Sequence, residues 1–139
     1  MAMVSVKLIV DVTVFTEHSV VLLKYADGPD QQNGWFIPNS ELAAPADLTE
    51  AARRILKDQI GLEAQTPEVA KVDSFIGRDG TWHLAVHFKC QLMGEAQLSP
   101  GSGVSDIRWC PLTDLPEGAE IAHHGWYLGI IRHATRELA

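Results

Sequence analysis

The chain has 139 residues and a mass of 15.3 kDa, which suits one compact domain, residues 1–139, with a hydrophobic core of its own. A formal net charge of −7 and a pI near 5.2 argue against nonspecific binding to nucleic acids or to acidic membranes. Cys90 and Cys110 are isolated and no segment has the layout of a membrane span or signal peptide, so a cytoplasmic protein is expected.

Strand patterns fill the N-terminal third. Residues 6–15, VKLIVDVTVF, carry aliphatic side chains at every second position, as a half-buried strand requires. Residues 19–25, SVVLLKY, lack this alternation and are expected to form a strand buried on both faces. Residues 25–34, YADGPDQQNG, are typical of a loop, and the following WFIP predicts a short extended segment that ends at Pro38.

The best-marked element is a helix that begins after Asp47 and ends at Gly61. Asp47 is a good N-cap, and Glu50 three residues later completes a capping-box pattern. Gly61 is the residue type preferred at a left-handed C-cap. Apolar residues recur at helical spacing between these ends and predict one buried stripe, formed by Leu48, Ala51, Ala52, Ile55, Leu56 and Ile60.

The C-terminal half predicts three further strands and a second helix. Residues 68–77 and 81–92 are expected to pair as a hairpin around Arg78-Asp79-Gly80, because Asp-Gly tolerates positive φ at both turn positions. IRWCPL, residues 107–112, predicts another strand, and residues 121–138 predict an amphipathic helix. Together the elements predict an α+β fold, an α/β/α sandwich in which helices flank one mixed sheet.

WFIP, the capped helix and Gly61-Leu62 resemble the Nudix (MutT-like) superfamily. The family's box reads G-x5-E-x7-R-E-U-x-E-E-x-G-U, with U apolar, and usually follows W-x-U-P-G. Aligned from Ser40 to Leu62 without a gap, the box finds its arginine at Arg54 and its apolar residues and glycine at Leu56, Gly61 and Leu62. IRWCPLTDLP and IAHHGWYLGII resemble later family segments, so the likeness covers nearly the whole chain and implies a Nudix-type sheet flanked by helices.

Other box positions depart from the family pattern. Ser40 replaces the first glycine, Ala46 the first glutamate, and Ile55 the glutamate that follows the arginine. Asp58 and Gln59 stand in place of the Glu-Glu pair. By resemblance, this helix would hold divalent cations that bridge substrate phosphates, so these departures bear directly on activity.

Three of the four positions that would carry glutamates, residues 55, 58 and 59, lie on adjoining turns of one helical face, at spacings i, i+3 and i+4. Mg²⁺ and Mn²⁺ prefer oxygen ligands, and Ile55, Asp58 and Gln59 provide a hydrocarbon, one charge and one neutral oxygen. We therefore expect either weak binding of Mg²⁺ or Mn²⁺, through Asp58, Gln59 and Glu50, or no metal. Glu50, Arg54 and Asp58 equally suit a surface ladder of i, i+4 ion pairs.

Candidates outside the metal positions are histidines and aromatic residues. His87 lies within a predicted strand and His123 near a predicted helix start, and either is a candidate general base. Trp35 and Trp82 are candidates for stacking on a nucleobase, with core or rim packing as the alternative.

Two polar residues of the box region complete the substrate-binding candidates. Asn39 takes a position where the family has a glycine, and asparagine tolerates a left-handed backbone better than most residues. Arg54 is either a phosphate contact or a structural partner.

Three functions are compatible with this pattern. The first is a diverged Nudix domain that binds a nucleotide or phosphorylated metabolite, with Mg²⁺-dependent hydrolysis weak or lost. The second is an active hydrolase of a nucleoside diphosphate derivative with a single metal or none; the GDP-mannose mannosyl hydrolases resemble this chain in having a depleted box. The third is an interaction domain without a ligand pocket. The resemblance also allows a homodimer, and the carboxylate count favours the first function.

Overall fold

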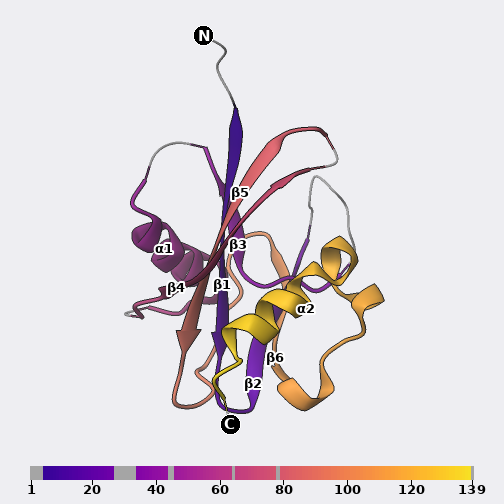
Figure 1. Cartoon of the computed structure of the whole chain (residues 1–139). Coiled ribbons are helices and arrows are strands. Elements are labelled where there is room, and N and C mark those ends of the chain that lie inside the picture. Colours follow the sequence, from indigo (N-terminus) through magenta and orange to yellow (C-terminus); the bar gives the residue numbers. More distant parts are fainter. Residues whose placement is uncertain (1–4, 27–33, 44–45, 64, 78, 139) are drawn as a thin grey trace.

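The fold comes from a computed structural model that describes residues 5–26, 34–43, 46–63, 65–77 and 79–138. One mixed sheet has the strand order β4-β5-β1-β2-β6, and β3 pairs with β1 (Figure 1). The elements are β1 (Val6–Phe15), β2 (Ser19–Tyr25), β3 (Asn39–Leu42), α1 (Leu48–Ile60), β4 (Glu68–Ile76), β5 (Trp82–Gln91), β6 (Val104–Pro111) and α2 (Ala122–Ala134). The predicted α+β fold, a mixed sheet flanked by helices, is confirmed.

The central strand β1 determines which residues of distant segments become neighbours. It runs parallel to β5, in a register that places Asp11 beside His87, and antiparallel to β2 and β3. The β1–β3 pairing places Asp11 beside Asn39 as well. Because 76 residues separate Asp11 from His87, only the parallel pairing of β1 with β5 brings them together.

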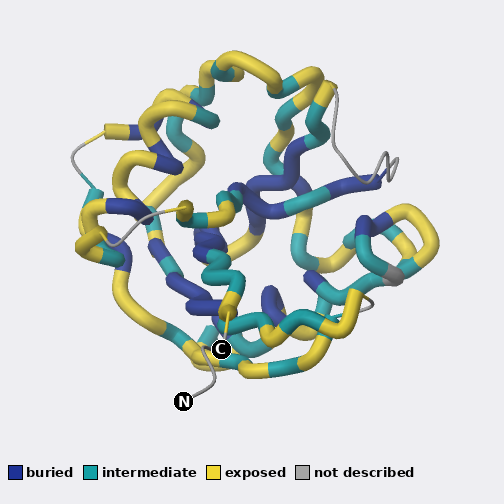
Figure 2. The backbone as a smooth tube through the Cα atoms, turned by 90° about the horizontal axis from the view of Figure 1, so that it is seen from above, coloured by how far each residue is buried: buried dark blue, intermediate teal, exposed yellow. Residues whose placement is uncertain are grey.

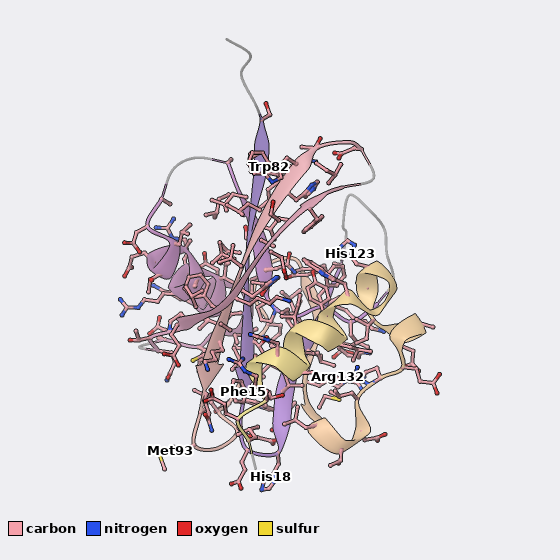
Figure 3. The ribbon with its side chains drawn as sticks, viewed as in Figure 1. Phe15, His18, Trp82, Met93, His123 and Arg132 are labelled. Atoms are coloured by element: carbon pink, nitrogen blue, oxygen red, sulfur yellow. The ribbon has the colours of Figure 1, made fainter. Side chains whose placement is uncertain are left out.

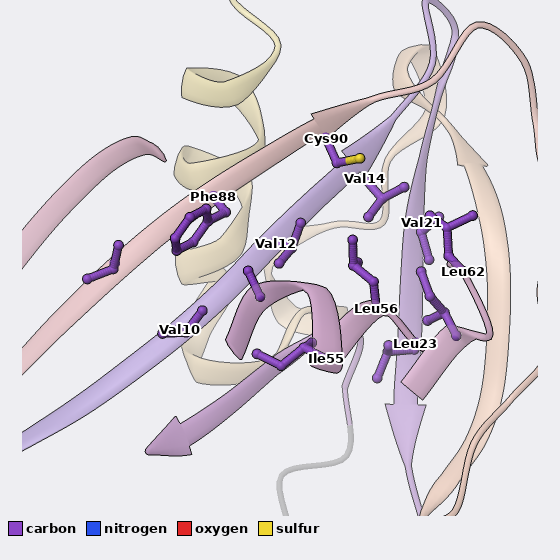
Figure 4. Packing of buried hydrophobic residues seen from close by; sticks show 13 residues of the cluster. Val10, Val12, Val14, Val21, Leu23, Ile55, Leu56, Leu62, Phe88 and Cys90 are labelled. Atoms are coloured by element: carbon purple, nitrogen blue, oxygen red, sulfur yellow. The ribbon is translucent and has the colours of Figure 1, made fainter. Parts of the chain in front are cut away.

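The two helices lie on opposite sides of the sheet, and each covers one hydrophobic cluster (Figure 1). Alternate residues of β1, among them Val10, Val12 and Val14, contact the side covered by α1, which contributes Ile55 and Leu56 (Figure 4). On the other side α2 covers a second cluster that includes Phe15 of β1. The strands at the centre of the molecule are therefore the most deeply buried part of the chain (Figure 2).

β1 is not the half-buried strand that its alternation predicts. From Val10 to Phe15 every residue is buried, including Asp11 and Thr13 on the side that α2 covers. The alternation shows which residues share a face, but it does not show that a distant helix closes the polar face as well. Burial of Asp11 is consequently a tertiary effect.

Both caps of α1 are confirmed. The Asp47 carboxylate accepts a hydrogen bond of 3.0 Å from the Glu50 N–H, and Gly61 adopts a left-handed φ of 71°. The Gly61 N–H then donates to the Lys57 carbonyl, which is the bond of an αL cap, and the Leu62 N–H donates to the Leu56 carbonyl. The C-terminal end of the helix is further held by the Gly101 N–H, which donates to the Gln59 carbonyl over 3.0 Å.

Element boundaries differ from the predictions at three places. The predicted extended segment at WFIP is present as isolated bridges, in which Phe36 exchanges backbone hydrogen bonds of 2.8 and 2.9 Å with Leu23. The regular strand β3 follows it, at Asn39–Leu42. β6 begins three residues before the predicted position, at Val104, and α2 ends at Ala134. In the β4–β5 turn the Asp79 carboxylate accepts from the Thr81 N–H, and Gly80 has a φ of 76°.

Parts of two predicted features lie outside the described residues, namely residues 27–33 of the first loop and Arg78 of the turn. None of the helices that the structure describes is long and apolar enough to cross a bilayer.

Candidate functional site

Ile55, at the position of a family glutamate, is part of the hydrophobic core. Its side chain is 5% exposed and belongs to the cluster under α1 (Figure 4). A carboxylate at this point would lose its hydration without gaining an ion-pair partner from the surrounding aliphatic side chains. The residue therefore stabilises the packing of α1 on the sheet.

Gln59 joins α1 to β3 and β2 through both ends of its amide. Its Nε2 donates to the Asn39 carbonyl over 2.7 Å, and its Oε1 accepts from the Tyr25 hydroxyl over 2.7 Å. The same hydroxyl accepts from the Asn39 backbone N–H and from Asn39 Nδ2, each over 3.2 Å. We call Tyr25, Asn39 and Gln59 the amide clasp.

The amide clasp is electrically neutral. Burial raises the pKa of the Tyr25 hydroxyl, so this group keeps its proton and can donate to Gln59 at any physiological pH. Asn39 lies in extended backbone at the start of β3, since His123 is the one non-glycine residue with positive φ in the described ranges. The clasp thus uses Asn39 as a hydrogen-bonding residue instead of as a left-handed turn residue.

Glu50, Arg54 and Asp58 line one open groove along α1, with a volume of about 450 Å³. The ladder of i, i+4 pairs does not form, because Glu50 accepts from Arg53 over 2.7 Å, and Arg53 also donates to Thr66. Spacings of three and four residues are both neighbours on a helix, and the second contact to Thr66 favours Arg53. Arg54 and Asp58 have no ion pair among the described residues.

These donors do not fit the divalent cation that a Nudix helix implies. Glu50 is engaged by Arg53, both polar atoms of the Gln59 amide are used within the clasp, and Ile55 has no oxygen to offer. Within the described ranges, no group of three or more His, Cys, Asp or Glu side chains is placed to hold a metal ion. Asp58 alone would leave a hard cation with too few protein oxygens.

His87 lies at the centre of a polar cluster on the other side of the sheet. Its Nδ1 lies 2.7 Å from Asp11 Oδ2, and its Nε2 lies 2.9 Å from Asp73 Oδ2. The side chains of His87 and Asp11 are 1% and 0% exposed, whereas Asp73 on β4 is 31% exposed. Because both ring nitrogens face carboxylates, the arrangement favours a doubly protonated, charged imidazole.

The environment of this cluster shifts two pKa values. Burial alone would lower the pKa of His87, but hydrogen bonds and charges from Asp11 and Asp73 outweigh it and raise that pKa above 6.5. Burial raises the pKa of Asp11, and the His87 imidazole opposes this rise. Asp73 also has a second partner, since its Oδ1 lies 3.4 Å from Lys71 Nζ.

The structure brings His87 and His123 into contact with the same indole. The ring of Trp126 lies 5.6 Å from the ring of His87 and 6.3 Å from that of His123, centroid to centroid. His123 adopts a φ of 55° at the start of α2, where Figure 3 labels it, and also contacts Phe36. The two candidate bases therefore contact one aromatic ring of α2, His87 from the sheet and His123 from the start of the helix.

The two tryptophan candidates lie apart from this region and from each other. Trp35 is 4% exposed, and the cationic groups of Lys24 and Arg108 lie 4.7 Å and 4.1 Å from its ring centroid. Trp82 is 41% exposed near the tip of the β4–β5 hairpin, where its Nε1 donates to Ser74 Oγ (Figure 3). Trp35 thus serves packing, and Trp82 is accessible but remote from α1.

Sequence reasoning missed Asp11, Asp73, Tyr25 and Trp126. Asp11 gave one signal in the sequence, because it is a carboxylate within an otherwise mostly aliphatic strand. Once β1 and β5 pair, this carboxylate lies next to His87. Asp73 and Tyr25 gave no such signal, because their partners depend on the β4–β5 register and on the approach of α1 to β2.

Comparison with known proteins agrees with this fold. A sequence profile of the NUDIX domain matches residues 6–130, and no curated protein is matched by the chain. Structural similarity extends to a MutT NUDIX hydrolase from Burkholderia pseudomallei, with a TM-score of 0.76 and 14% identity over 94% of this chain and 99% of the other.

Two further solved structures are similar. The NUDIX domain of Shewanella oneidensis NrtR, crystallised with ADP ribose, has a TM-score of 0.75 and 21% identity over 100% of this chain and 90% of that one. A MutT/nudix family protein from Enterococcus faecalis has a TM-score of 0.69 and 18% identity over 80% of this chain, which spans 46% of its length. The profile match over most of the residues, together with the sheet, the capped helix and the terminal helix, shows that this chain belongs to the Nudix family.

Proposed function

We propose that this Nudix domain binds a nucleotide or a phosphorylated metabolite and that its Mg²⁺-dependent hydrolysis is weak or lost. Family membership supports the class of ligand, and the NrtR domain that is similar in fold was crystallised with ADP ribose. Identity with that domain is 21%, so the nucleotide itself has to be identified by experiment.

The amide clasp is the observation that carries the proposal. The Gln59 amide, at a position where the family has a glutamate, donates to the Asn39 carbonyl and accepts from Tyr25, both over 2.7 Å. A carboxylate could not make the first of these bonds, because it has no hydrogen to donate. The position is therefore built for a neutral amide that fixes α1 on the sheet, and a cation would have to break the clasp to reach it.

Arg54 is the residue that we assign to the ligand's phosphates. It lies in the groove along α1, with Arg53 and Lys57 as neighbours, and the ion pairs of this region go to those two neighbours. A guanidinium can donate two parallel hydrogen bonds to a phosphate, which gives direction as well as charge. Asp58, which lines the same groove, would then offset part of the positive charge of Arg53, Arg54 and Lys57.

Calorimetric titration of the full chain with ADP-ribose, ADP and a GDP-linked sugar tests binding, with Mg²⁺, with Mn²⁺ and with EDTA. We expect at least one ligand to bind with an affinity that EDTA does not change. Arg54→Ala should weaken that binding by about ten-fold, or 1.4 kcal/mol. Arg132→Ala, an exposed arginine on α2, is the matched control and should leave affinity unchanged.

Chromatography of the same mixtures tests hydrolysis. Mg²⁺-dependent product formation at an ordinary enzymatic turnover of about 1 to 10³ per second would contradict the proposal. Absence of binding by every member of the ligand panel would favour an interaction domain without a ligand pocket.

The second candidate function is a hydrolase that uses His87 as a metal-free base. Asp11 holds one ring nitrogen of His87 from a fully buried position, as an orienting carboxylate does in base dyads. The other ring nitrogen lies 2.9 Å from Asp73, so this carboxylate would have to release His87 before the ring could accept a proton. EDTA-resistant turnover that His87→Gln abolishes would favour this alternative.

A further inference from the structure

β4 forms one edge of the sheet and pairs only with β5 in the strand order. α1 packs chiefly on β1, and in Figure 1 the β4–β5 hairpin extends past both helices. An edge strand presents unpaired N–H and C=O groups on its outer side, which another strand can pair with unless charge, a bulge or a covering segment prevents it. The state of each half of β4 therefore decides whether this edge is open.

The N-terminal half of β4 is closed. A register shift between Val69 and Lys71 interrupts the pairing with β5 at Ala70. The carbonyl of Ala70 accepts a hydrogen bond from His133 Nε2 of α2, over 3.1 Å. A β-bulge and a bonded carbonyl both discourage strand addition, so this half cannot continue the sheet.

The C-terminal half of β4, from Lys71 to Ile76, is regular. The Gly77 N–H donates to the Thr81 carbonyl over 2.8 Å, which makes this residue pair a hydrogen-bonded one. Since bonding alternates along an antiparallel strand, residues of odd number bond to β5 and those of even number direct their backbone groups outward. Val72, Ser74 and Ile76 thus offer three consecutive outward sites.

The same half of β4 also exposes the apolar side chains of Val72 and Ile76 to solvent. Among the described residues, five of the six exposed large hydrophobic side chains, all except Met93, lie on β4, on its partner β5 or on the adjoining end of β1, where Val6 pairs with Trp82 and Trp82 pairs with Ile76. These five, which we call the β4 strip, are Val6, Val69, Val72, Ile76 and Trp82, with exposed fractions of 40, 54, 53, 68 and 41%. Scattered exposed hydrophobics are normal, but a contiguous patch marks an interaction surface.

One register of a second copy pairs the whole open segment, residues 71–77, with itself. Suppose that a two-fold axis passes between the Ser74 residues of two copies. Ser74 of one copy then lies opposite Ser74 of the other, and each copy's Val72 lies opposite the other copy's Ile76. This register uses only residues 71–77, places Asp73 opposite Phe75, and brings no like charges together. An axis at Asp73 would oppose two carboxylates, and an axis at Val72 would pair Ser74 with the bulged Ala70.

The opposite edge of the sheet lacks these properties. β6 carries Asp106 and Arg108 in its exposed middle and ends at Pro111, which has no N–H to donate. Charged side chains and proline are features that protect an edge strand from pairing. β4 also carries charges, Lys71 and Asp73, but these pair with each other and Asp73 with His87, and its C-terminal half has no proline. The edge that bears the β4 strip is therefore the more open of the two.

We infer that the chain forms a homodimer in which the β4 strands of two copies pair antiparallel about Ser74 and extend the sheet across both. The interface is isologous, so each copy provides the same backbone groups and the same pair of Val72 and Ile76. The β4 strip of both copies then forms one continuous apolar surface on the side of the sheet that faces away from α2.

Light scattering coupled to gel filtration tests the dimer on the full chain. We expect twice the mass of one 15.3 kDa chain, falling toward one chain on dilution. The double variant Val72→Lys with Ile76→Lys should run as one chain with an unchanged circular dichroism spectrum, because both side chains are exposed. Met93→Lys, at the end of the molecule opposite Trp82 in Figure 3, is the control and should remain a dimer. A single-chain mass for the unmodified protein at millimolar concentration would overturn the inference, as would a dimeric double variant.

Cysteine cross-linking tests the position of the two-fold axis and does not depend on the double variant folding. Residues opposite each other in a hydrogen-bonded antiparallel pair lie about 5.5 Å apart between Cα atoms, which a disulfide can span. Ser74→Cys should therefore cross-link under mild oxidation, and Ser105→Cys on β6 should not. The native thiols of Cys90 and Cys110 are buried and give little background. Cross-linking through residue 105 in place of residue 74 would refute pairing at β4.

Discussion

Gln59→Glu is the substitution that best separates a structural amide from a vacant metal position. Gln59 Nε2 donates to the Asn39 carbonyl over 2.7 Å, and the glutamate that replaces it would direct a carboxylate oxygen at this carbonyl instead. Tyr25 could still donate to the other oxygen. The variant therefore loses one hydrogen bond, leaves one carbonyl unpaired, and introduces repulsion between two oxygens.

The expected cost follows from these losses. An unpaired, partly buried acceptor costs about 1 to 3 kcal/mol, and the half-buried charge brings the total toward the upper end of that range. Each kcal/mol lowers the melting temperature of a domain of this size by roughly 3 to 5 °C. We therefore expect Gln59→Glu to melt roughly 6 to 15 °C below the unmodified protein at neutral pH.

Thermal denaturation followed by circular dichroism measures the effect, with Gln91→Glu, an exposed residue at the end of β5, as a control of equal charge. The deficit should shrink in acid, because a protonated glutamate can donate to the Asn39 carbonyl again. If Gln59→Glu instead melts at the wild-type temperature, the bond from Gln59 to Asn39 does not stabilise the fold and the structural role is refuted. If millimolar Mn²⁺ raises the melting temperature of this variant selectively, the position is a metal site that lacks its carboxylate.

Three further substitutions test other parts of the structure. The pKa of His87 is raised, so the folded state holds this proton more tightly; the stabilisation is complete below the ordinary value of 6.5 and is lost as pH rises through the folded pKa. Urea denaturation should show stability falling as pH rises above 6.5, by about 1.4 kcal/mol for each unit of the shift, and His87→Gln should flatten this dependence. Asp58→Ala should change the free energy of unfolding by less than about 0.5 kcal/mol, and a larger loss would reveal an ion-pair partner. Gly101→Ala should destabilise by roughly 3 kcal/mol or more because its Cβ would collide with the Asp58 carbonyl, whereas Gly94→Ala, which faces open space, should be neutral; equal melting temperatures would contradict that packing.

The sequence was sufficient for α1 because the signals that form this helix are local. Asp47, Gly61 and the apolar stripe act within a few residues of one another, and the structure confirms each of them. Alternation likewise identified the residues of β1 and β5 that share a face. The exact extent of β3 and β6 was not predictable, because short edge segments are fixed by their pairing partners more than by their own composition.

The polar clusters could not be predicted, because each is assembled by pairings between distant segments. Asp11 and His87 are 76 residues apart, and Tyr25 and Gln59 are 34 residues apart. A one-residue change in the β1–β5 register would move His87 to the neighbour of a valine and leave Asp11 without its imidazole. His87 was a candidate for its residue type, but its environment between two carboxylates is a property of the sheet.

Apart from Arg54, the box residues that match the family stabilise α1 whatever chemistry it performs. Gly61 ends the helix in a left-handed turn, Leu56 and Leu62 pack in the cluster beneath it, and these roles need no ion. The glutamate positions have roles of their own in this chain, since Ile55 fills the core and Gln59 closes the amide clasp. Restoring glutamate at both would place one carboxylate among aliphatic side chains and another against a carbonyl, so it would weaken the fold before it could gather a cation. Ile55 and Gln59 therefore both fix α1 on the sheet without a metal ion. Recovering metal binding would require Asn39 and the core beneath Ile55 to change as well.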